Sequence, residues 1–146
     1  MITAKIEGLD KTLGRLSKLS SGCRSNLLAA VNKATGVVEA GAKTFCPVSP
    51  GGGNLRGSIH PIPAKVEGNA VVGYVHTNVE YAIYVEFGTG RRGDGRYPYE
   101  TNQNLTYDQD WPGMAPQPYL GRSLNANKKV VRAIIRSATS KAVDNV

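Results

Sequence analysis

The 146-residue chain has few of the residues on which most enzymes and metal sites depend: two histidines, two cysteines and one tryptophan. These histidines and cysteines do not show the His-x-x-x-His or Cys-x-x-Cys spacing of a metal site. His60 and His76 lie in or near expected strands, which favours structural roles, and Ser58 and Ser123 lack the surroundings of a nucleophile elbow. We therefore expect no catalysis, no cofactor and no metal.

Long hydrophobic runs are also missing. The apolar runs span only a few residues, far below the roughly 20 that a membrane span needs, and residues 1–7 lack the basic-then-apolar plan of a signal peptide. We expect a protein without a membrane partner, which works where it is made or leaves the cell by some route other than secretion. Cys23 and Cys46 bracket an expected helix about 30 Å long, so free thiols in a reducing compartment are expected.

Charge is unevenly distributed along the chain. The formal net charge of +7 divides into +5 over residues 1–60, −3 over residues 61–110 and +5 over residues 111–146. A basic chain favours contact with a polyanion, whereas alternating segments favour self-assembly through opposite patches on neighbouring copies. Composition alone does not decide between these two interpretations.

The spacing of apolar residues predicts three helices. The first is a short helix marked by Leu9, Leu13, Leu16 and Leu19. The second is marked by Leu27, Val31, Ala34, Val38, Ala42 and Phe45, is ended by Pro47, and has enough Ala and Gly to pack closely. The third is marked by Leu120, Leu124, Val131, Ile134, Ile135 and Ala138.

A β-hairpin is expected in the middle of the chain. Residues 56–66 predict an edge strand interrupted by Pro61 and Pro63, and residues 70–75 predict its partner after a turn at 68–69. Residues 47–53 predict an exposed loop. Residues 81–88 fit either a strand by alternation or a short helix with Gly88 as its C-cap, and we favour the helix. The sequence predicts one α+β domain over residues 1–146, with a small antiparallel sheet packed with two or three helices.

Two glycine-rich stretches do not fit nucleotide binding. Residues 51–58 lack the lysine that reaches a nucleotide's phosphates. Residues 88–93 match G-x-G-x-x-G, but residues 94–98 end in Tyr97-Pro98 and cannot open a phosphate-binding helix.

Residues 88–118 predict a long loop or arm before the C-terminal helix, because Gly, Pro, Asn and Tyr recur there without an apolar period. The arm is rich in residue types of interface cores: Arg91, Arg92, Arg96, Tyr97, Tyr99, Tyr107, Trp111, Met114 and Tyr119. Contact with a partner is favoured over a loop that covers its own domain. The polar face of the C-terminal helix carries Lys128, Lys129, Arg132 and Arg136, which either contact DNA phosphates or form a solvated face.

Several short motifs together resemble a known family, the head–tail neck or tail-completion proteins of long-tailed bacteriophages. They are residues 6–9, 42–47, 54–59 (Asn-Leu-Arg-Gly-Ser-Ile), 81–89 (Tyr-Ala-Ile-Tyr-Val-Glu-Phe-Gly-Thr) and 115–120 (Ala-Pro-Gln-Pro-Tyr-Leu). The order of the motifs agrees over nearly the whole chain. The loop at 48–53 and the stretch from Gly90 to Gly113 are longer than in short members.

The resemblance implies a structural virion protein that forms a ring, most often of six copies, around the DNA between capsid and tail. It implies contacts with a head connector or adaptor and with a tail terminator or tail tube protein, after assembly in the bacterial host cytoplasm. The interface candidates that we carry forward are Arg56, Glu86 and Gln117, with Arg91, Arg92, Arg96, Tyr97, Tyr99, Trp111 and Tyr119 of the arm.

Arg56 and Glu86 are further interpreted as partners, either as an ion pair or as anchors for the backbone, within the same fold or across a subunit boundary, because Glu86 lies in an apolar run and needs partners if it is buried. Two alternatives remain for the function. One is a DNA-binding accessory protein that uses the basic helices, and the other, disfavoured, is a hydrolase that uses His76.

Overall fold

The structure, a computed structural model, describes residues 2–7, 21–68 and 70–144. It has three strands, β1 (Ile2–Glu7), β2 (His60–Glu67) and β3 (Ala70–Thr77), within the described residues. The helices are α2 (Ser21–Phe45), α3 (Asn54–Ser58), α4 (Ala82–Phe87), α5 (Gly90–Gly93), α6 (Leu120–Ala126) and α7 (Lys128–Asp144). The expected α+β fold is confirmed, and the helix expected at Leu9–Leu19 lies outside the described residues.

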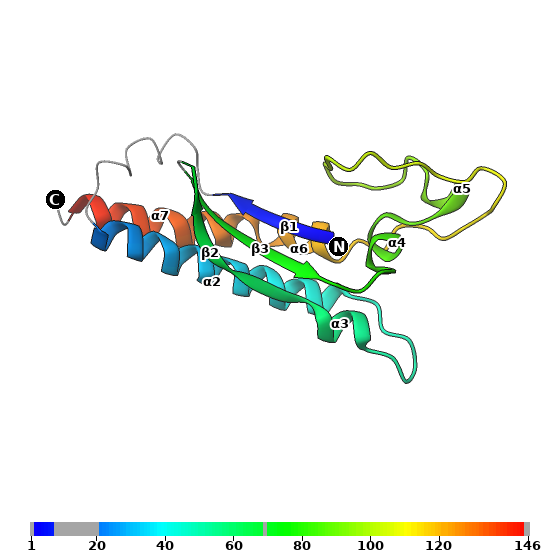
Figure 1. The fold of residues 1–146 in the computed structure, drawn as a ribbon, viewed down its shortest axis with the longest axis horizontal. Helices are drawn as coiled ribbons and strands as arrows, with labels where there is room; N and C mark the ends of the chain where they lie inside the picture. The colour runs from blue at the N-terminus through cyan, green and yellow to red at the C-terminus, as the bar shows by residue number, and fades with distance from the viewer. Residues whose placement is uncertain (1, 8–20, 69, 145–146) are drawn as a thin grey trace.

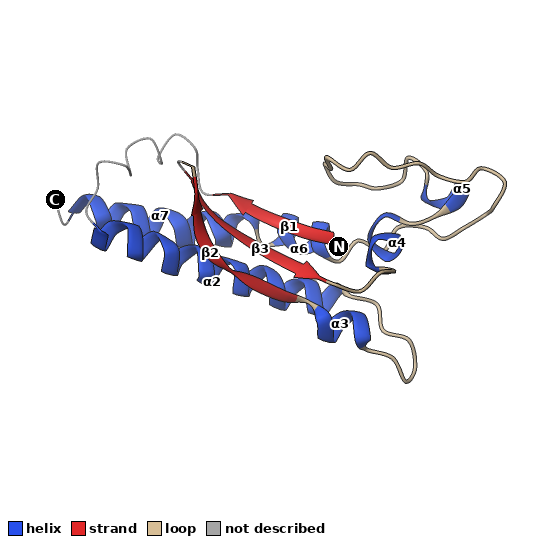
Figure 2. Ribbon diagram, in the orientation of Figure 1, coloured by secondary structure: helices blue, strands red, loops and turns tan. Residues whose placement is uncertain are grey.

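The antiparallel sheet has the order β1-β3-β2 (Figure 2). The prolines of β2 therefore lie at an edge, as predicted, and the register shifts between Ile62 and Lys65. Strand β1, which the sequence reading missed, pairs with β3 from the other side and makes β3 the central strand. The expected strand start at residue 56 is wrong, because residues 54–58 form α3 and β2 begins only at His60.

Helix α2 is the central element of the fold, since it contacts β2 and β3 of the sheet as well as α6 and α7, which lie alongside it (Figure 1). The predicted core positions of α2 are confirmed, with five of them buried and Phe45 partly buried. Gly73 of β3 allows the close approach, because a Cβ there would lie 2.8 Å from Cγ1 of Val31. The core thus lies between the sheet and α2 and continues to the C-terminal helices.

The expected C-terminal helix is divided in two. Helix α6 ends at Asn127, whose side-chain amide donates to the backbone oxygen of Ser123 (3.0 Å), and α7 follows. The hydroxyl of Ser123 donates to the backbone oxygen of Val38 (2.6 Å), where Gly41 leaves room for α6 to approach α2. The small residues of α2 thus have the packing role that the sequence suggested.

Residues 82–87 form helix α4, so the favoured helix is confirmed and the strand alternative is wrong. Gly88 ends this helix with a φ of 76°, a conformation that favours glycine. The arm, residues 88–118, contains only the short helix α5 and otherwise irregular backbone. Figure 1 shows the arm at one end of the elongated molecule, while the C-terminal end of α7 lies at the other.

Candidate assembly surface

The carboxylate of Glu86 holds the arm and helix α6 together. It is 1% exposed, and its Oε1 accepts hydrogen bonds from the Tyr97 hydroxyl (2.7 Å) and the Gly121 backbone N–H (2.8 Å). Its Oε2 accepts from the backbone N–H groups of Tyr119 (2.8 Å) and Leu120 (2.9 Å). We call these residues the Glu86 cluster.

The position of Glu86 follows from the needs of a helix N-terminus. The first N–H groups of a helix have no partner within the helix and present a partial positive charge. Tyr119, the N-cap residue of α6, makes no side-chain cap hydrogen bond. The carboxylate from α4 takes over the capping role, so α4 and α6 are joined through a buried charge.

Two further aromatic rings pack against Tyr97 of the Glu86 cluster. The Tyr97 ring lies 4.6 Å from Phe87 and 5.7 Å from Tyr99, measured between centroids. Burial raises the pKa of Tyr97 above its ordinary value, and the nearby carboxylate of Glu86 raises it further. Burial and Glu86 also raise the pKa of Tyr119. Both phenols therefore stay protonated at neutral pH, and Tyr97 donates to the carboxylate.

The two ends of the arm are hydrogen-bonded to each other. Thr89 and Met114 exchange backbone hydrogen bonds of 2.8 and 3.0 Å, and the N–H of Arg91 donates to the backbone oxygen of Trp111 (3.0 Å). Gly88 and Gly113, both with positive φ, make this approach possible, since a Cβ on either would collide with the opposite backbone. Gly90 and Gly93, the other glycines of the G-x-G-x-x-G match, are equally close to backbone atoms, so the match serves backbone packing at the base of the arm.

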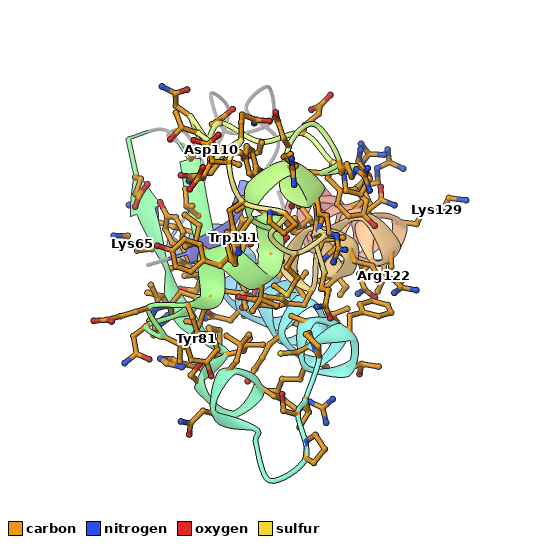
Figure 3. All side chains as sticks on the ribbon, turned by 90° about the vertical axis from the view of Figure 1, so that its right-hand side faces the viewer. Lys65, Tyr81, Asp110, Trp111, Arg122 and Lys129 are labelled. Carbon is orange, nitrogen blue, oxygen red and sulfur yellow. The ribbon has the colours of Figure 1, made fainter. Side chains whose placement is uncertain are left out.

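The arm exposes a large aromatic residue beside charged ones. Trp111 is 54% exposed, and Arg91, Arg92 and Arg96 are also exposed. Figure 3 shows Trp111 and Asp110 on the arm, at the end of the molecule that faces the viewer. The structure therefore places these four of the sequence-predicted interface residues where a partner can reach them.

The sequence reading missed two exposed aromatics on α4 and its N-cap. Tyr81 is 47% exposed and Tyr84 is 57% exposed, and both are large apolar side chains at the surface. Their spacing of three residues places them on one side of a helix. The same alternation that made residues 81–88 ambiguous concealed this feature, because it groups Tyr81 with Ile83 instead of Tyr84.

Other predicted interface residues lie inside the fold. Glu86 and Tyr119 are buried, and their contacts are within the chain, so they position the arm and do not present a surface. Arg56 and Glu86 form no ion pair with each other within the described part of the chain: the Arg56 guanidinium donates to the backbone oxygen of Cys46 (3.0 Å). Within the chain both side chains bind backbone groups instead, Arg56 at Cys46 and Glu86 at the start of α6.

The last two predicted interface residues, Tyr99 and Gln117, differ in their exposure. Tyr99 is partly buried against Tyr97, whereas the Gln117 side chain is exposed and its backbone N–H donates to Val85 (2.8 Å). That hydrogen bond places the end of the arm along α4, next to the Glu86 cluster.

The C-terminal helices α6 and α7 carry exposed positive charge. Lys128, Lys129, Arg132 and Arg136 are exposed on α7, as the sequence predicted. Arg122 of α6, which was not singled out, is also exposed and lies with its guanidinium 4.4 Å from the centroid of Phe45 (Figure 3). This part of the molecule can bind an acidic surface or a polyanion.

The two histidines face each other across β2 and β3. Their ring centroids are 4.2 Å apart with an interplanar angle of 71°, and Nδ1 of His60 lies 2.6 Å from the backbone oxygen of Ser58. Partial burial and the neighbouring His60 lower the pKa of His76.

In the part of the chain that the structure describes, no group of three or more His, Cys, Asp or Glu side chains converges as metal ligands. No helix in the same residues is long and apolar enough to cross a bilayer.

Comparison with known protein families identifies the family of this chain. Residues 10–88, just over half of the chain, match the family model described as "Bacteriophage HK97-gp10, putative tail-component". No curated protein and no solved structure matches the chain. The matched segment includes α2, the hairpin and α4 with Glu86, whereas most of the arm and both C-terminal helices follow it. The chain belongs to the HK97-gp10-like family of bacteriophage tail components, and it is a structural protein of the virion.

Proposed function

We propose that the protein forms a closed ring of six copies at the junction of phage tail and head. The observation that carries the proposal is membership of a family of phage tail components, since a component of a tail contacts other virion proteins. The arm supports it, because Glu86 and the paired backbone at its base hold exposed residues in a fixed geometry. Fixed side chains lose little conformational entropy when they bind.

The proposed partners follow from this position. One face of the ring binds a head connector or adaptor protein, the other binds a tail terminator or tail tube protein, and double-stranded DNA passes through the opening. Assembly takes place in the cytoplasm of the bacterial host. The protein catalyses no reaction, since its work consists of contacts between copies and with neighbouring rings.

Electron microscopy of the purified protein, alone and incubated with isolated tails, tests the proposal. We expect rings with six-fold symmetry, either free or at the head-proximal end of the tail. A protein that stays monomeric alone and adds no density to tails would refute the ring.

A second candidate function is DNA binding by the protein outside a ring. The exposed basic residues of α7, Lys128, Lys129 and Arg132 among them, favour it. Counterion release predicts that four phosphate contacts give a slope of about −3.6 in log K against log salt. Tight binding of duplex DNA by the monomer at physiological salt would rank this function above the ring.

A further inference from the structure

Acidic and basic residues are separated between the arm and the helices that follow it. From Tyr97 to Gly121 the chain has no lysine or arginine, and its charged residues are Glu100, Asp108 and Asp110. From Arg122 to Arg136 it has five basic residues and no acidic one. We call residues 97–111 the distal arm, and Arg122, Lys128, Lys129 and Arg132 the basic face.

Both sets of charges are available for an external partner. The three carboxylates of the distal arm and the four cations of the basic face are exposed. Among the described residues, none of these seven groups forms an ion pair within the chain. Lys128 and Lys129 lie three or four residues before Arg132, so their charges gather on one side of α7.

The two sets of charges lie on different parts of the molecule and form no ion pair with each other among the described residues, which favours contact between copies. The arm lies at one end of the long axis, while α7 runs from the middle of the molecule to the other end (Figure 1). Two different surfaces at different places on one chain form a heterologous, head-to-tail contact, which closes into a ring when the rotation between copies permits it.

Trp111 adds an apolar contact to this electrostatic complementarity. It is 54% exposed, is preceded directly by Asp110, and its backbone oxygen accepts the hydrogen bond from Arg91. The distal arm is also held by Tyr107, whose hydroxyl donates to the backbone oxygen of Phe87 (3.1 Å), and by Gln109, whose amide donates to Asp94 (2.9 Å). Exposed tryptophans on fixed backbone are typical of residues that dominate binding energy at interfaces.

We propose that the distal arm of each copy docks on the basic face of the next copy, with Trp111 packed against α6 or α7 of that neighbour. The proposal rests on the proposed ring and names the surfaces that close it. The occupant of the basic face is a second copy of this chain, because the complementary acidic surface belongs to the same sequence and projects from one end of the molecule, whereas the basic face lies on α6 and the start of α7, in its middle (Figure 1). Both surfaces lie beyond residues 10–88, the segment shared with the family.

Two charge-reversed full-length variants test the docking. The arm variant is Glu100→Lys with Asp110→Lys, at two exposed carboxylates. The carboxylates of the arm that accept hydrogen bonds from Gln109 and from the Asp110 backbone, those of Asp94 and Asp108, are left in place. The helix variant is Lys128→Glu with Lys129→Glu. Glu80→Lys, a reversal of an exposed carboxylate outside the arm, is the control. Analytical ultracentrifugation measures ring formation for each variant alone and for an equimolar mixture of the two.

Each variant alone brings like charges together at every contact, so we expect the dissociation constant of the ring to rise at least about tenfold. In the mixture, contacts between unlike variants are complementary in both directions, and a ring with an even number of copies can alternate them. We therefore expect the mixture and Glu80→Lys to form rings as the wild type does. Trp111→Ala is expected to weaken the ring about tenfold, and Val66→Ala, at an exposed valine of β2, to leave it unchanged.

The other outcomes separate this inference from the proposed function. If all variants form rings as the wild type does, the docking is refuted and the ring stands. If only the helix variant fails and the mixture does not recover, the basic face binds another ligand, such as DNA, and the docking is again refuted. If the wild type forms no ring alone or with tails, the proposed function itself fails.

Discussion

Replacement of Glu86 by glutamine tests the central contact of the fold. Each carboxylate oxygen accepts two hydrogen bonds in a buried site, so an amide in either orientation loses two of the four and turns an N–H group toward other donors. A hydrogen bond to a charged group contributes about 1.5 to 3 kcal/mol. We therefore expect Glu86→Gln to lower the free energy of unfolding by about 3 to 5 kcal/mol, which corresponds to a fall in Tm of about 10 to 16 °C.

Urea denaturation followed by circular dichroism measures this loss, and hydrogen exchange shows where it acts. The backbone N–H groups of Leu120 and Gly121 are expected to exchange faster in the variant, because they lose their acceptor. Glu100→Gln, at an exposed carboxylate of the arm, is the matched control and is expected to behave as the wild type. A Glu86→Gln protein as stable as this control would refute the role of the cluster.

Three further predictions concern single contacts. Gly121→Ala is expected to lower the free energy of unfolding by about 1 to 3 kcal/mol, because its Cβ would collide with side chains of the Glu86 cluster. Gly57→Ala, the control, has open space around it and should leave stability unchanged in thermal unfolding. Equal effects of the two substitutions would contradict this prediction. The pKa of His76 is lower in the folded chain than its ordinary value of 6.5, so the unfolded chain binds more protons at acidic pH and stability should fall as the pH drops from 7 to 5. His76→Gln is expected to reduce this dependence of stability on pH, measured by urea titrations at several pH values, and an unchanged dependence would contradict the prediction. Arg56→Ala is expected to lower stability by about 1 kcal/mol through loss of its hydrogen bond to the Cys46 carbonyl. It is also expected to speed alkylation of the buried Cys46 thiol by iodoacetamide. Alkylation at the wild-type rate would show that the Arg56 contact does not hold the backbone at Cys46.

The local sequence pattern was enough to predict a long helix, from the regular spacing of its apolar residues, and the edge position of a strand, from its prolines. The spacing of Leu27, Val31 and Val38 defined α2 and its buried side, and Pro61 with Pro63 placed β2 at an edge. These features follow from the period of a helix and the missing N–H of proline.

Contacts between distant segments were not readable in the same way. Strand β1 pairs with residues about 70 positions later, and nothing within Ile2–Glu7 marks that pairing. The sequence indicated that Glu86 needs partners if buried, but it could not show that they are backbone N–H groups 33 to 35 residues away. The division of the C-terminal helix at Asn127 depends on Ser123 binding α2, which is again a tertiary contact.

The candidate surface was predicted by residue type more reliably than by position. The arginines of the arm and Lys128, Lys129, Arg132 and Arg136 of α7 are exposed, as expected because charged side chains rarely become buried without partners. Trp111 is exposed as well. Tyr119 was misassigned because an aromatic residue in a loop fits an interface and a core equally well. Its burial follows from the docking of residues 117–121 on α4, which only the fold reveals.

The number of copies in each assembled particle tests the account most directly. Quantitative mass spectrometry of purified virions, with labelled peptides of this chain and of an abundant tail protein as standards, measures that number. We predict six copies per particle. A single copy per virion would contradict a ring that assembles through contacts between identical chains.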